Sequence, residues 1–223
     1  MVSEEELRRQ AEEIDMDLER ESANQPPKRF FTPLRIVLSL FLALIIVLMV
    51  VPYYGVRIDP NPKDIPQPSE VVPTNLTLPD GNYDRNPSNF RLLIKTTPEI
   101  KLIADRIVSR SCQSSKVCDA KALFLFVRDN LNYVSDPPDE YVKQPVETLL
   151  TFSGDCDDAS VLLASLLTAV GIPVEFRFVP QHVYLQAYLP ESPKHYQSEG
   201  GWVNLDPTCK NCGFGELPVK YSS

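Results

Sequence analysis

Apolar residues along this chain form one long uninterrupted run and several shorter stretches with regular spacing. The run from Ile36 to Val51 contains one polar residue, Ser39, and aromatic residues lie on both of its flanks. A helix of about twenty apolar residues spans a bilayer core of roughly 30 Å, and aromatic residues commonly lie at its two interfaces. We therefore predict a transmembrane helix at residues 30–54, and the alternative is a cleaved signal peptide.

The charges on the two flanks of this run differ. Lys28, Arg29 and Arg35 lie at its N-terminal end, whereas Arg57 and Lys63 are the nearest cations that follow it. Positive residues stay preferentially on the cytoplasmic side of a membrane helix. The sequence thus predicts a single-pass protein of the cell membrane, with its N-terminus in the cytoplasm and the remainder of the chain outside.

Polar and proline-rich segments surround the apolar run. The N-terminal segment mixes acidic and basic side chains with few large apolar ones, which is typical of a charged helix or a disordered tail. The prolines between Pro60 and Pro98 remove backbone donors, so neither helix nor sheet can propagate far there. We expect a charged cytoplasmic tail at residues 1–29, the transmembrane helix at 30–54, a proline-rich stalk at 55–89 and one globular domain at 90–223.

The globular domain begins with helical spacing. Apolar residues recur every three or four positions in Ile100–Ser109 and Ala120–Leu131, so each segment predicts a helix with one buried face. Pro145–Phe152 indicates a shorter helix or turn. Asp157–Val170 is strongly apolar and is followed by Gly171, a common residue after a helix C-terminus, so this segment predicts the buried helix.

Short strands follow the helices. Val174–Val179, His182–Leu189 and Trp202–Leu205 are rich in β-branched and aromatic residues and are separated by turn residues, which predicts an antiparallel sheet. Helices first and a sheet afterwards predict an α+β fold.

Composition and charge narrow the functional classes. The formal net charge is −8, and no basic stripe occurs beyond the membrane flank, so we expect no nucleic-acid partner. The sequence contains no glycine-rich phosphate loop, and we predict no cofactor. It does not indicate an oligomeric state.

Three residues are candidates for chemistry. Cys156 lies at the start of the apolar helix, where free N–H groups and the helix dipole stabilise a thiolate. His182 opens one strand and Asp206 ends the next. A thiol nucleophile needs an imidazole to accept its proton, and the imidazole needs a carboxylate to orient it. Each residue alone also fits a structural role, as a buried cysteine, a sheet histidine or a turn aspartate, whereas together they predict a catalytic triad.

The same segments resemble the transglutaminase-like superfamily. Its Gly-x-Cys-x-Asp nucleophile turn corresponds to residues 154–158, its histidine to His182-Val183, and its aspartate to Asp206 in residues 204–208. The resemblance covers about Ala120 to Thr208 and is closest to membrane-anchored archaeal or bacterial members. It implies a papain-like core, with helices followed by an antiparallel sheet.

This resemblance also implies a reaction. Cys156 would attack the carbonyl of a peptide or glutamine-type amide to form a thioester, with His182 as base and then acid, and Asp206 orienting His182. The protein would be a cysteine protease, an amidase or an acyltransferase acting on a peptide or protein substrate, with hydrolysis favoured. The sequence lacks the accessory β-domains and calcium sites of animal transglutaminases, so calcium dependence and cross-linking are not implied. The alternative is a non-catalytic surface binding or assembly module on the same fold.

The other four cysteines form two close pairs. Cys112 and Cys118 are separated by six positions, and Cys209 and Cys212 form a Cys-x-x-Cys motif. Two disulfides with Cys156 as the remaining thiol fit an external domain and are the preferred interpretation. A four-cysteine structural zinc site is the rival interpretation, and a redox role for Cys209 and Cys212 is a third hypothesis.

Overall fold

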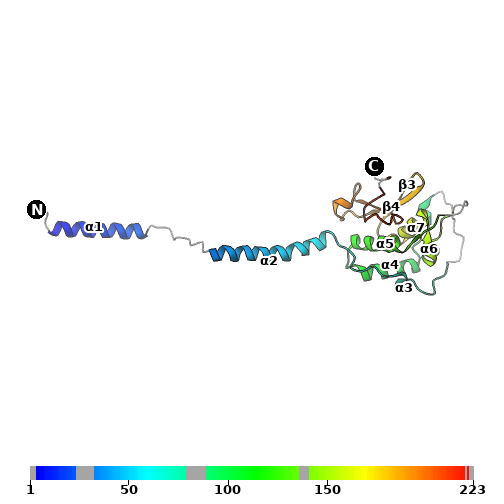
Figure 1. Ribbon diagram of the computed structural model, residues 1–223, viewed down its shortest axis with the longest axis horizontal. Helices are drawn as coiled ribbons and strands as arrows, with labels where there is room; N and C mark the ends of the chain where they lie inside the picture. The colour runs from blue at the N-terminus through cyan, green and yellow to red at the C-terminus, as the bar shows by residue number, and fades with distance from the viewer. Residues whose placement is uncertain (1–3, 24–32, 79–88, 136–140, 219, 221–223) are drawn as a thin grey trace. The chain divides into compact units, whose positions relative to one another are not determined.

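The computed structural model of the protein describes residues 4–23, 33–78, 89–135, 141–218 and 220 (Figure 1). The chain divides into two compact units, residues 1–51 and residues 52–223. The predicted transmembrane helix begins in the first unit, and the predicted catalytic residues all belong to the second.

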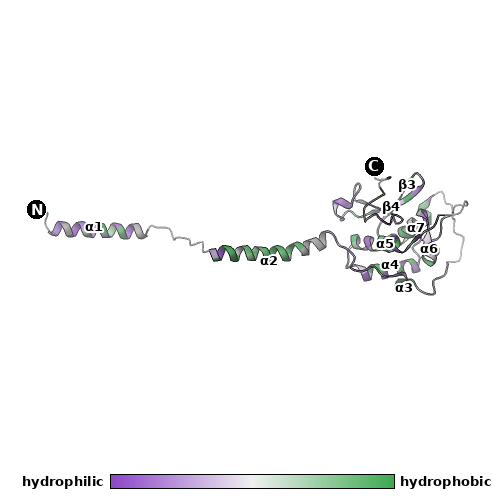
Figure 2. Ribbon diagram, viewed as in Figure 1, coloured by the Kyte–Doolittle hydropathy of each residue, from purple (hydrophilic) through white to green (hydrophobic). Residues whose placement is uncertain are grey.

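The first unit contains a charged helix and most of an apolar one. Helix α1 spans Glu4–Ala23, and helix α2 spans Pro33–Ile58 and continues into the second unit. Of the helices that the structure describes, α2 is the one long and apolar enough to cross a membrane, over Pro33–Val51, and its hydrophobic character is visible in Figure 2. By length and composition it fits either a membrane span or a signal sequence.

The second unit contains the helices predicted at residues 100–109, 120–131, 145–152 and 157–170 and, among the described residues, three short helices that were not predicted. They are α3 (Pro68–Val71), the 3-10 helix η1 (Phe90–Leu93), α4 (Pro98–Ser111), α5 (Lys116–Asn130), α6 (Pro145–Thr151), α7 (Cys156–Ala169) and the 3-10 helix η2 (Lys194–Tyr196). Polar caps set where α4 and α5 begin, because the side chains of Thr97 and Ser115 accept hydrogen bonds from backbone N–H groups of the first turn. Pro98 fits the first turn of α4, where its missing N–H leaves no helical hydrogen bond unmade.

A three-stranded antiparallel sheet follows the helices. Its strands are β3 (Val174–Val179), β4 (His182–Tyr188) and β5 (Trp202–Leu205), in the order β3-β4-β5. Along β4, the side chains of Val183, Leu185 and Ala187 are buried in the core. The helices and the sheet confirm the predicted α+β fold.

A short parallel strand pair was not predicted from the sequence. Strand β1 (Asn132–Tyr133) pairs with strand β2 (Ser153–Gly154), with Tyr133 opposite Gly154. Two-residue strands are too short to show any alternation of apolar and polar residues, so pattern analysis could not find them. The pair matters because β2 leads directly to the start of α7.

Helix α7 is the buried centre of the second unit. All residues from 157 to 167 are buried, and the helix packs against α4, α5, α6, β3 and β4. It ends as predicted at Gly171, whose φ of 76° favours glycine. The N–H groups of Gly171 and Ile172 bond the carbonyls of Thr168 (2.9 Å) and Leu167 (3.0 Å), the pattern of a Schellman motif.

Part of the segment predicted as a stalk packs against the helices. Val71 and Leu76 belong to the hydrophobic core, and Arg106 of α4 donates to the carbonyl of Val71 at 2.9 Å. The backbone N–H of Lys63 donates to the carbonyl of Ser111 at 3.0 Å. The prolines do prevent long helices here, but isolated apolar residues between them are enough to attach the segment to the domain.

A buried lysine attaches the beginning of this segment. The ammonium of Lys121 on α5 is bound by Asp59, by Asn61 (2.8 Å) and by the hydroxyl of Tyr196 (3.3 Å), and the Tyr196 hydroxyl also donates to Asp59 at 3.0 Å. The lysine side chain is buried, so its charge needs these partners. The ordered domain therefore starts near Asp59, about thirty residues before the predicted boundary.

Two disulfides connect the four paired cysteines. Cys112 is bonded to Cys118 with a Cα–Cα distance of 5.8 Å, and Cys209 to Cys212 with a Cα–Cα distance of 5.3 Å. These pairs are the two of the preferred interpretation, and a sulfur in a disulfide is not available as a thiolate ligand for zinc. Cys156 is left with a free thiol.

We expect a domain that begins at Phe90 to be less stable than one that begins at Asp59. The shorter domain loses the burial of Val71 and Leu76, each worth about 1.5–3 kcal/mol, so its free energy of unfolding should fall by about 3 kcal/mol or more. Urea unfolding of both proteins measures the difference. Val71→Ala in the longer domain should reproduce part of the loss, and equal midpoints for the two domains would show that residues 59–78 contribute nothing.

Candidate active site

Cys156 is the first residue of α7 and carries the free thiol. Asp155 caps the helix, because its side chain accepts a hydrogen bond from the backbone N–H of Asp157 at 3.2 Å. The first N–H groups of a helix carry partial positive charge, which stabilises a neighbouring thiolate. Cys156 is partly exposed.

His182 contacts both of the other predicted site residues. Its Nε2 is 2.8 Å from Oδ2 of Asp206, and its ring also hydrogen-bonds the Cys156 thiol. Because Nε2 faces the carboxylate, Nδ1 is the ring nitrogen left for the sulfur. The structure therefore brings together three residues from the start of α7, the start of β4 and the end of β5.

The surroundings of His182 favour its charged form. The hydrogen bond to Asp206 and then that to Cys156 raise the pKa of His182 to about 10, against an opposing effect of partial burial. The ring is therefore an imidazolium at neutral pH, which places a positive charge beside the sulfur of Cys156. Its contribution to folding stability is complete below about pH 6.5, the ordinary pKa of histidine, and is lost as the pH rises toward 10.

Thr208 holds the carboxylate of Asp206. Its backbone N–H and its hydroxyl both donate to Oδ1 of Asp206, at 3.0 and 2.8 Å, which leaves Oδ2 for His182. Burial raises the pKa of Asp206, but the hydrogen bonds from His182 and Thr208 outweigh it, so the pKa lies below its ordinary value. Asp206 is therefore ionised at neutral pH and its orientation is determined by Thr208.

The position of the Asp158 side chain requires a glycine at position 154 of the nucleophile turn. Its buried carboxylate accepts hydrogen bonds from the backbone N–H and from Nζ of Lys143, each at 2.6 Å. A Cβ atom at Gly154 would lie only 2.4 Å from Oδ2 of Asp158. The glycine leaves room for the carboxylate, and the carboxylate holds the segment that carries Lys143 against the start of α7.

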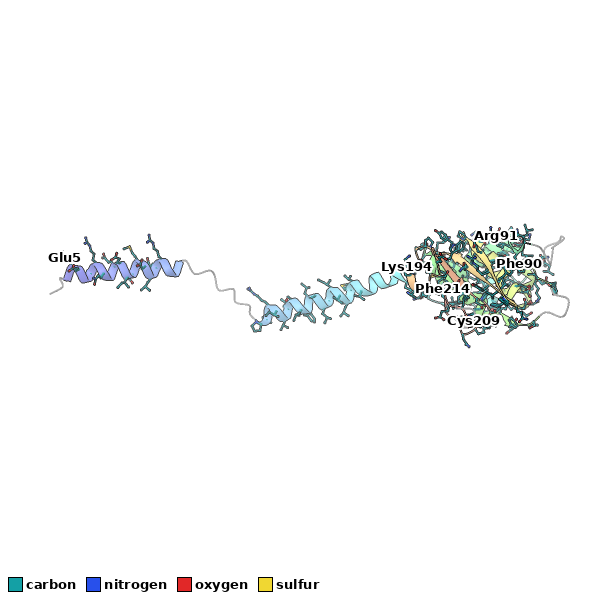
Figure 3. The ribbon with its side chains drawn as sticks, turned by 90° about the horizontal axis from the view of Figure 1, so that it is seen from above. Glu5, Phe90, Arg91, Lys194, Cys209 and Phe214 are labelled. Atoms are coloured by element: carbon teal, nitrogen blue, oxygen red, sulfur yellow. A yellow bond between two sulfur atoms is a disulfide. The ribbon has the colours of Figure 1, made fainter. Side chains whose placement is uncertain are left out.

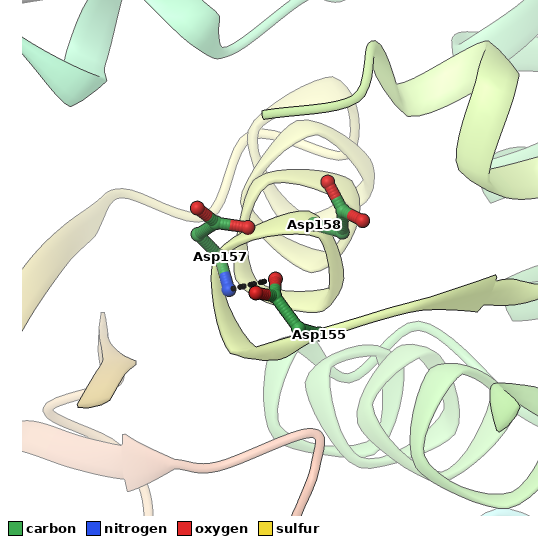
Figure 4. A group of neighbouring side chains, drawn as sticks. All are labelled: Asp155, Asp157 and Asp158. Atoms are coloured by element: carbon green, nitrogen blue, oxygen red, sulfur yellow. Dashed lines mark hydrogen bonds between the residues drawn. The ribbon is translucent and has the colours of Figure 1, made fainter. Parts of the chain in front are cut away.

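Three carboxylates gather at the start of α7 (Figure 4). One oxygen each from Asp155, Asp157 and Asp158 lies within 4.8 Å of the others, a spacing that suits a cation. Asp158, however, already binds the ammonium of Lys143, and Asp155 already accepts the N–H of Asp157. Because protein donors already occupy two of the three carboxylates, we assign no metal to this group.

Asp157 is neutral at physiological pH. Burial, followed by the hydrogen bond to Asp155 and the charges of Asp155, Asp158 and Cys156, raises its pKa to about 9. Its Oδ1 is buried and has no hydrogen-bond partner among the described residues. The sequence places aspartates next to Cys156, and their negative charges would oppose a thiolate there. Protonation of Asp157 removes one of these charges.

Two further residues lie beside the site and were not predicted from the sequence. Tyr133 on β1 is close to Cys156. Burial raises the pKa of Tyr133 most, and the neighbouring Cys156 raises it further. Lys143 reaches α7 from the segment before α6. Neither carries a signal in the sequence, because Tyr133 lies in a two-residue strand and Lys143 is fifteen positions from its partner.

The match to a family model defines the class of the domain. Residues 103–207 match the family model of the Transglutaminase-like superfamily. This range includes Cys156, His182 and Asp206, and it confirms the family resemblance seen in the sequence. No curated protein matches the chain.

Solved structures with similarity to this chain include two bacterial proteins. One is a candidate protease from Parabacteroides distasonis ATCC 8503, with 17% identity and a TM-score of 0.38, covering 48% of this chain and 22% of that one. The other is a candidate cysteine protease from Cytophaga hutchinsonii, with 16% identity and a TM-score of 0.37, covering 56% of this chain and 43% of that one. This chain thus spans less than half of the length of either protein.

We expect Lys143→Met to destabilise the domain strongly. The substitution leaves the buried carboxylate of Asp158 without its ammonium partner, which should cost about 2–4 kcal/mol. Lys101→Met is the matched control, because Lys101 pairs with Asp105 on the exposed surface of α4 and should cost less than about 0.5 kcal/mol. Urea unfolding of the single variants and of the double variant Lys143→Met/Asp158→Asn measures the free energy of the Lys143–Asp158 pair. Equal losses of stability in Lys143→Met and Lys101→Met would contradict the prediction.

We expect Asp157→Asn to change how stability depends on pH. A carboxyl whose pKa is about 9 when folded and near its ordinary value of 3.8 when unfolded makes stability fall as the pH rises between those values. The variant should therefore match the native protein near pH 4 and exceed it by at least about 1 kcal/mol at pH 8. Urea unfolding at several pH values tests this, and a difference that does not change with pH would show that Asp157 is ionised.

Proposed function

We propose that the protein is a membrane-anchored, extracytoplasmic thiol enzyme that acts on peptide or glutamine-type amide bonds. Cys156 is the nucleophile, His182 is the base and then the acid, and Asp206 orients His182. The observation that carries this proposal is the position of His182, which hydrogen-bonds the Cys156 thiol and the Asp206 carboxylate at once. Such an arrangement converts a weak nucleophile into an imidazolium–thiolate pair.

The first half of the reaction forms a thioester. The Cys156 thiolate attacks the carbonyl carbon of the amide, and the carbonyl oxygen becomes an oxyanion. The backbone N–H of Cys156, at the start of α7, is a donor for that oxyanion. His182 then gives its proton to the leaving nitrogen, the C–N bond breaks, and the amine departs.

The second half releases the acyl group. Water attacks the thioester carbonyl while His182 takes one of its protons, the C–S bond breaks, and a carboxylic acid and the Cys156 thiolate result. The partial exposure of Cys156 supports water as the acceptor, because transfer to an amine requires water to be kept away from the thioester. Hydrolysis is therefore proposed in preference to acyl transfer.

The location of the domain is part of the proposal. The apolar helix α2 and the cations before it support an anchor at residues 30–54 with residues 1–29 in the cytoplasm. The two disulfides support an oxidising compartment for the domain that follows. The redox hypothesis for Cys209 and Cys212 receives less support, because the free thiol in the domain is Cys156.

We expect Cys156 of the full chain in detergent to react with iodoacetamide at pH 6–7 at least about tenfold faster than an ordinary thiol, because few ordinary thiols are ionised there. His182→Ala and Asp206→Asn should each remove most of this rate. His195→Ala is the matched control, because His195 is the other histidine of the chain and is exposed. Mass spectrometry of the alkylated peptide gives the rates.

The opposite result would favour the alternative function. If Cys156 titrates like an ordinary thiol, or if its rate is the same in His182→Ala as in the native chain, the triad is not activated. The domain would then be a binding or assembly module that keeps the fold of its family without the reaction.

A further inference from the structure

A disulfide closes the chain just after the candidate aspartate. Cys209 and Cys212 are bonded to each other with two residues between them, and the first of them follows Asp206 by three positions. The backbone N–H of Cys212 also donates to the carbonyl of Cys209 at 3.1 Å. Cys209 is labelled in Figure 3. We call residues 209–212 the disulfide loop.

The disulfide loop begins directly after the residue that holds the carboxylate of Asp206. Thr208 donates twice to Oδ1 of Asp206, through its backbone N–H and its hydroxyl. The next N–H along the chain, that of Cys209, donates to the backbone carbonyl of Asp206 at 3.3 Å. A covalent crosslink restricts the conformations that the residues at its ends can adopt. Thr208 is therefore held between Asp206 and a closed loop.

Two cations attach the disulfide loop to the end of α5. Nζ of Lys210 donates to the carbonyls of Arg128 and Leu131, the latter at 2.6 Å. In the other direction, Nη1 of Arg128 donates to the carbonyl of Cys212 at 2.8 Å. The last carbonyls of a helix lack helical partners and carry partial negative charge, which suits an ammonium. The loop cannot move away from α5 without breaking these bonds.

The end of α5 is also connected to the nucleophile turn. Strand β1 begins two residues after α5 ends. The N–H of Asn132 on β1 donates to the carbonyl of Phe152 at 2.8 Å, and the N–H of Val134 donates to that of Gly154 at 2.9 Å. Gly154 lies two positions before Cys156. The segment that carries the candidate nucleophile and the turn that carries the candidate aspartate are thus both attached to the same end of α5.

We propose that the disulfide loop is a positioning element of the candidate site: its attachment to α5 keeps Thr208 on the carboxylate of Asp206, and thereby keeps Asp206 on His182. This proposal rests on the proposed function and adds residues outside the triad on which the geometry of the triad depends. The bond between Cys209 and Cys212 acts through Thr208 and Asp206 and takes no part in the reaction itself.

The test is an NMR titration of the two histidines in the full chain in detergent. The pKa of His182 is about 10, and its largest cause is the hydrogen bond to Asp206, so this pKa reports how well the carboxylate is held. In the double variant Cys209→Ser/Cys212→Ser, we expect the pKa of His182 to be lower by at least about one pH unit, a tenfold change in its proton affinity. His195, which is exposed, gives the second signal of the spectrum.

The other disulfide provides the matched control. Cys112 follows α4 directly and Cys118 lies in the first turn of α5, at the opposite end of that helix from the disulfide loop. The double variant Cys112→Ser/Cys118→Ser should leave the titration of His182 unchanged. An equal fall of the pKa in both double variants would show that losing either disulfide loosens the whole domain, and the positioning role would be wrong.

Lys210→Met tests the attachment while the disulfide stays intact. This variant removes the two bonds from the ammonium to α5, so the pKa of His182 should fall, by less than in the cysteine variant. Lys194→Met is its control, because Lys194 bonds Gln197 at the exposed surface at 3.3 Å. If Cys209→Ser/Cys212→Ser does not fold, these lysine variants decide, and a native titration in Lys210→Met overturns the proposal.

The iodoacetamide rate of the native chain separates this proposal from the proposed function. If Cys156 is activated but His182 titrates alike in the native chain and in Cys209→Ser/Cys212→Ser, the positioning role is wrong and the proposed reaction stands. If Cys156 is not activated in the native chain, the proposed reaction fails, and a positioning role in that reaction fails with it.

Discussion

The packing of α7 against β4 is the constraint on which the second unit depends. Leu162 and Leu166 on the helix and Leu185 and Leu205 on the strands are fully buried in one core. This burial places the start of the helix at the end of β5 and the beginning of β4. Cys156, His182 and Asp206 therefore meet because of apolar contacts that lie elsewhere along the same elements.

Burial and one lysine reduce the negative charge at the start of α7. Three of the four residues from 155 to 158 carry carboxyl groups, yet Asp158 is paired with Lys143 and Asp157 holds its proton. The imidazolium of His182 adds positive charge on the other side of the thiol. The local field at Cys156 is thus less negative than the count of aspartates suggests.

The pattern of apolar and polar residues predicts most elements of the domain. The spacing of apolar residues predicts α4 and α5, and the strongly apolar content of residues 157–170 predicts the buried helix α7. The β-branched and aromatic stretches predict the three strands of the sheet. It did not predict the attachment of residues 59–78, whose buried residues are isolated between prolines, or the β1–β2 pair. Contacts made by one or two residues have no period, so they cannot be recognised along the chain.

The sequence by itself determined the class of the domain, the apolar helix before it and the identity of the three candidate residues. Local motifs were sufficient for this, because a cysteine at a helix start and a histidine and an aspartate at strand ends are visible in order along the chain. The tertiary structure decided that His182 contacts both partners, that Lys143 and Thr208 hold the two buried carboxylates, and that Asp157 is neutral. These properties depend on distance and burial, which arise only when segments far apart in the sequence pack together.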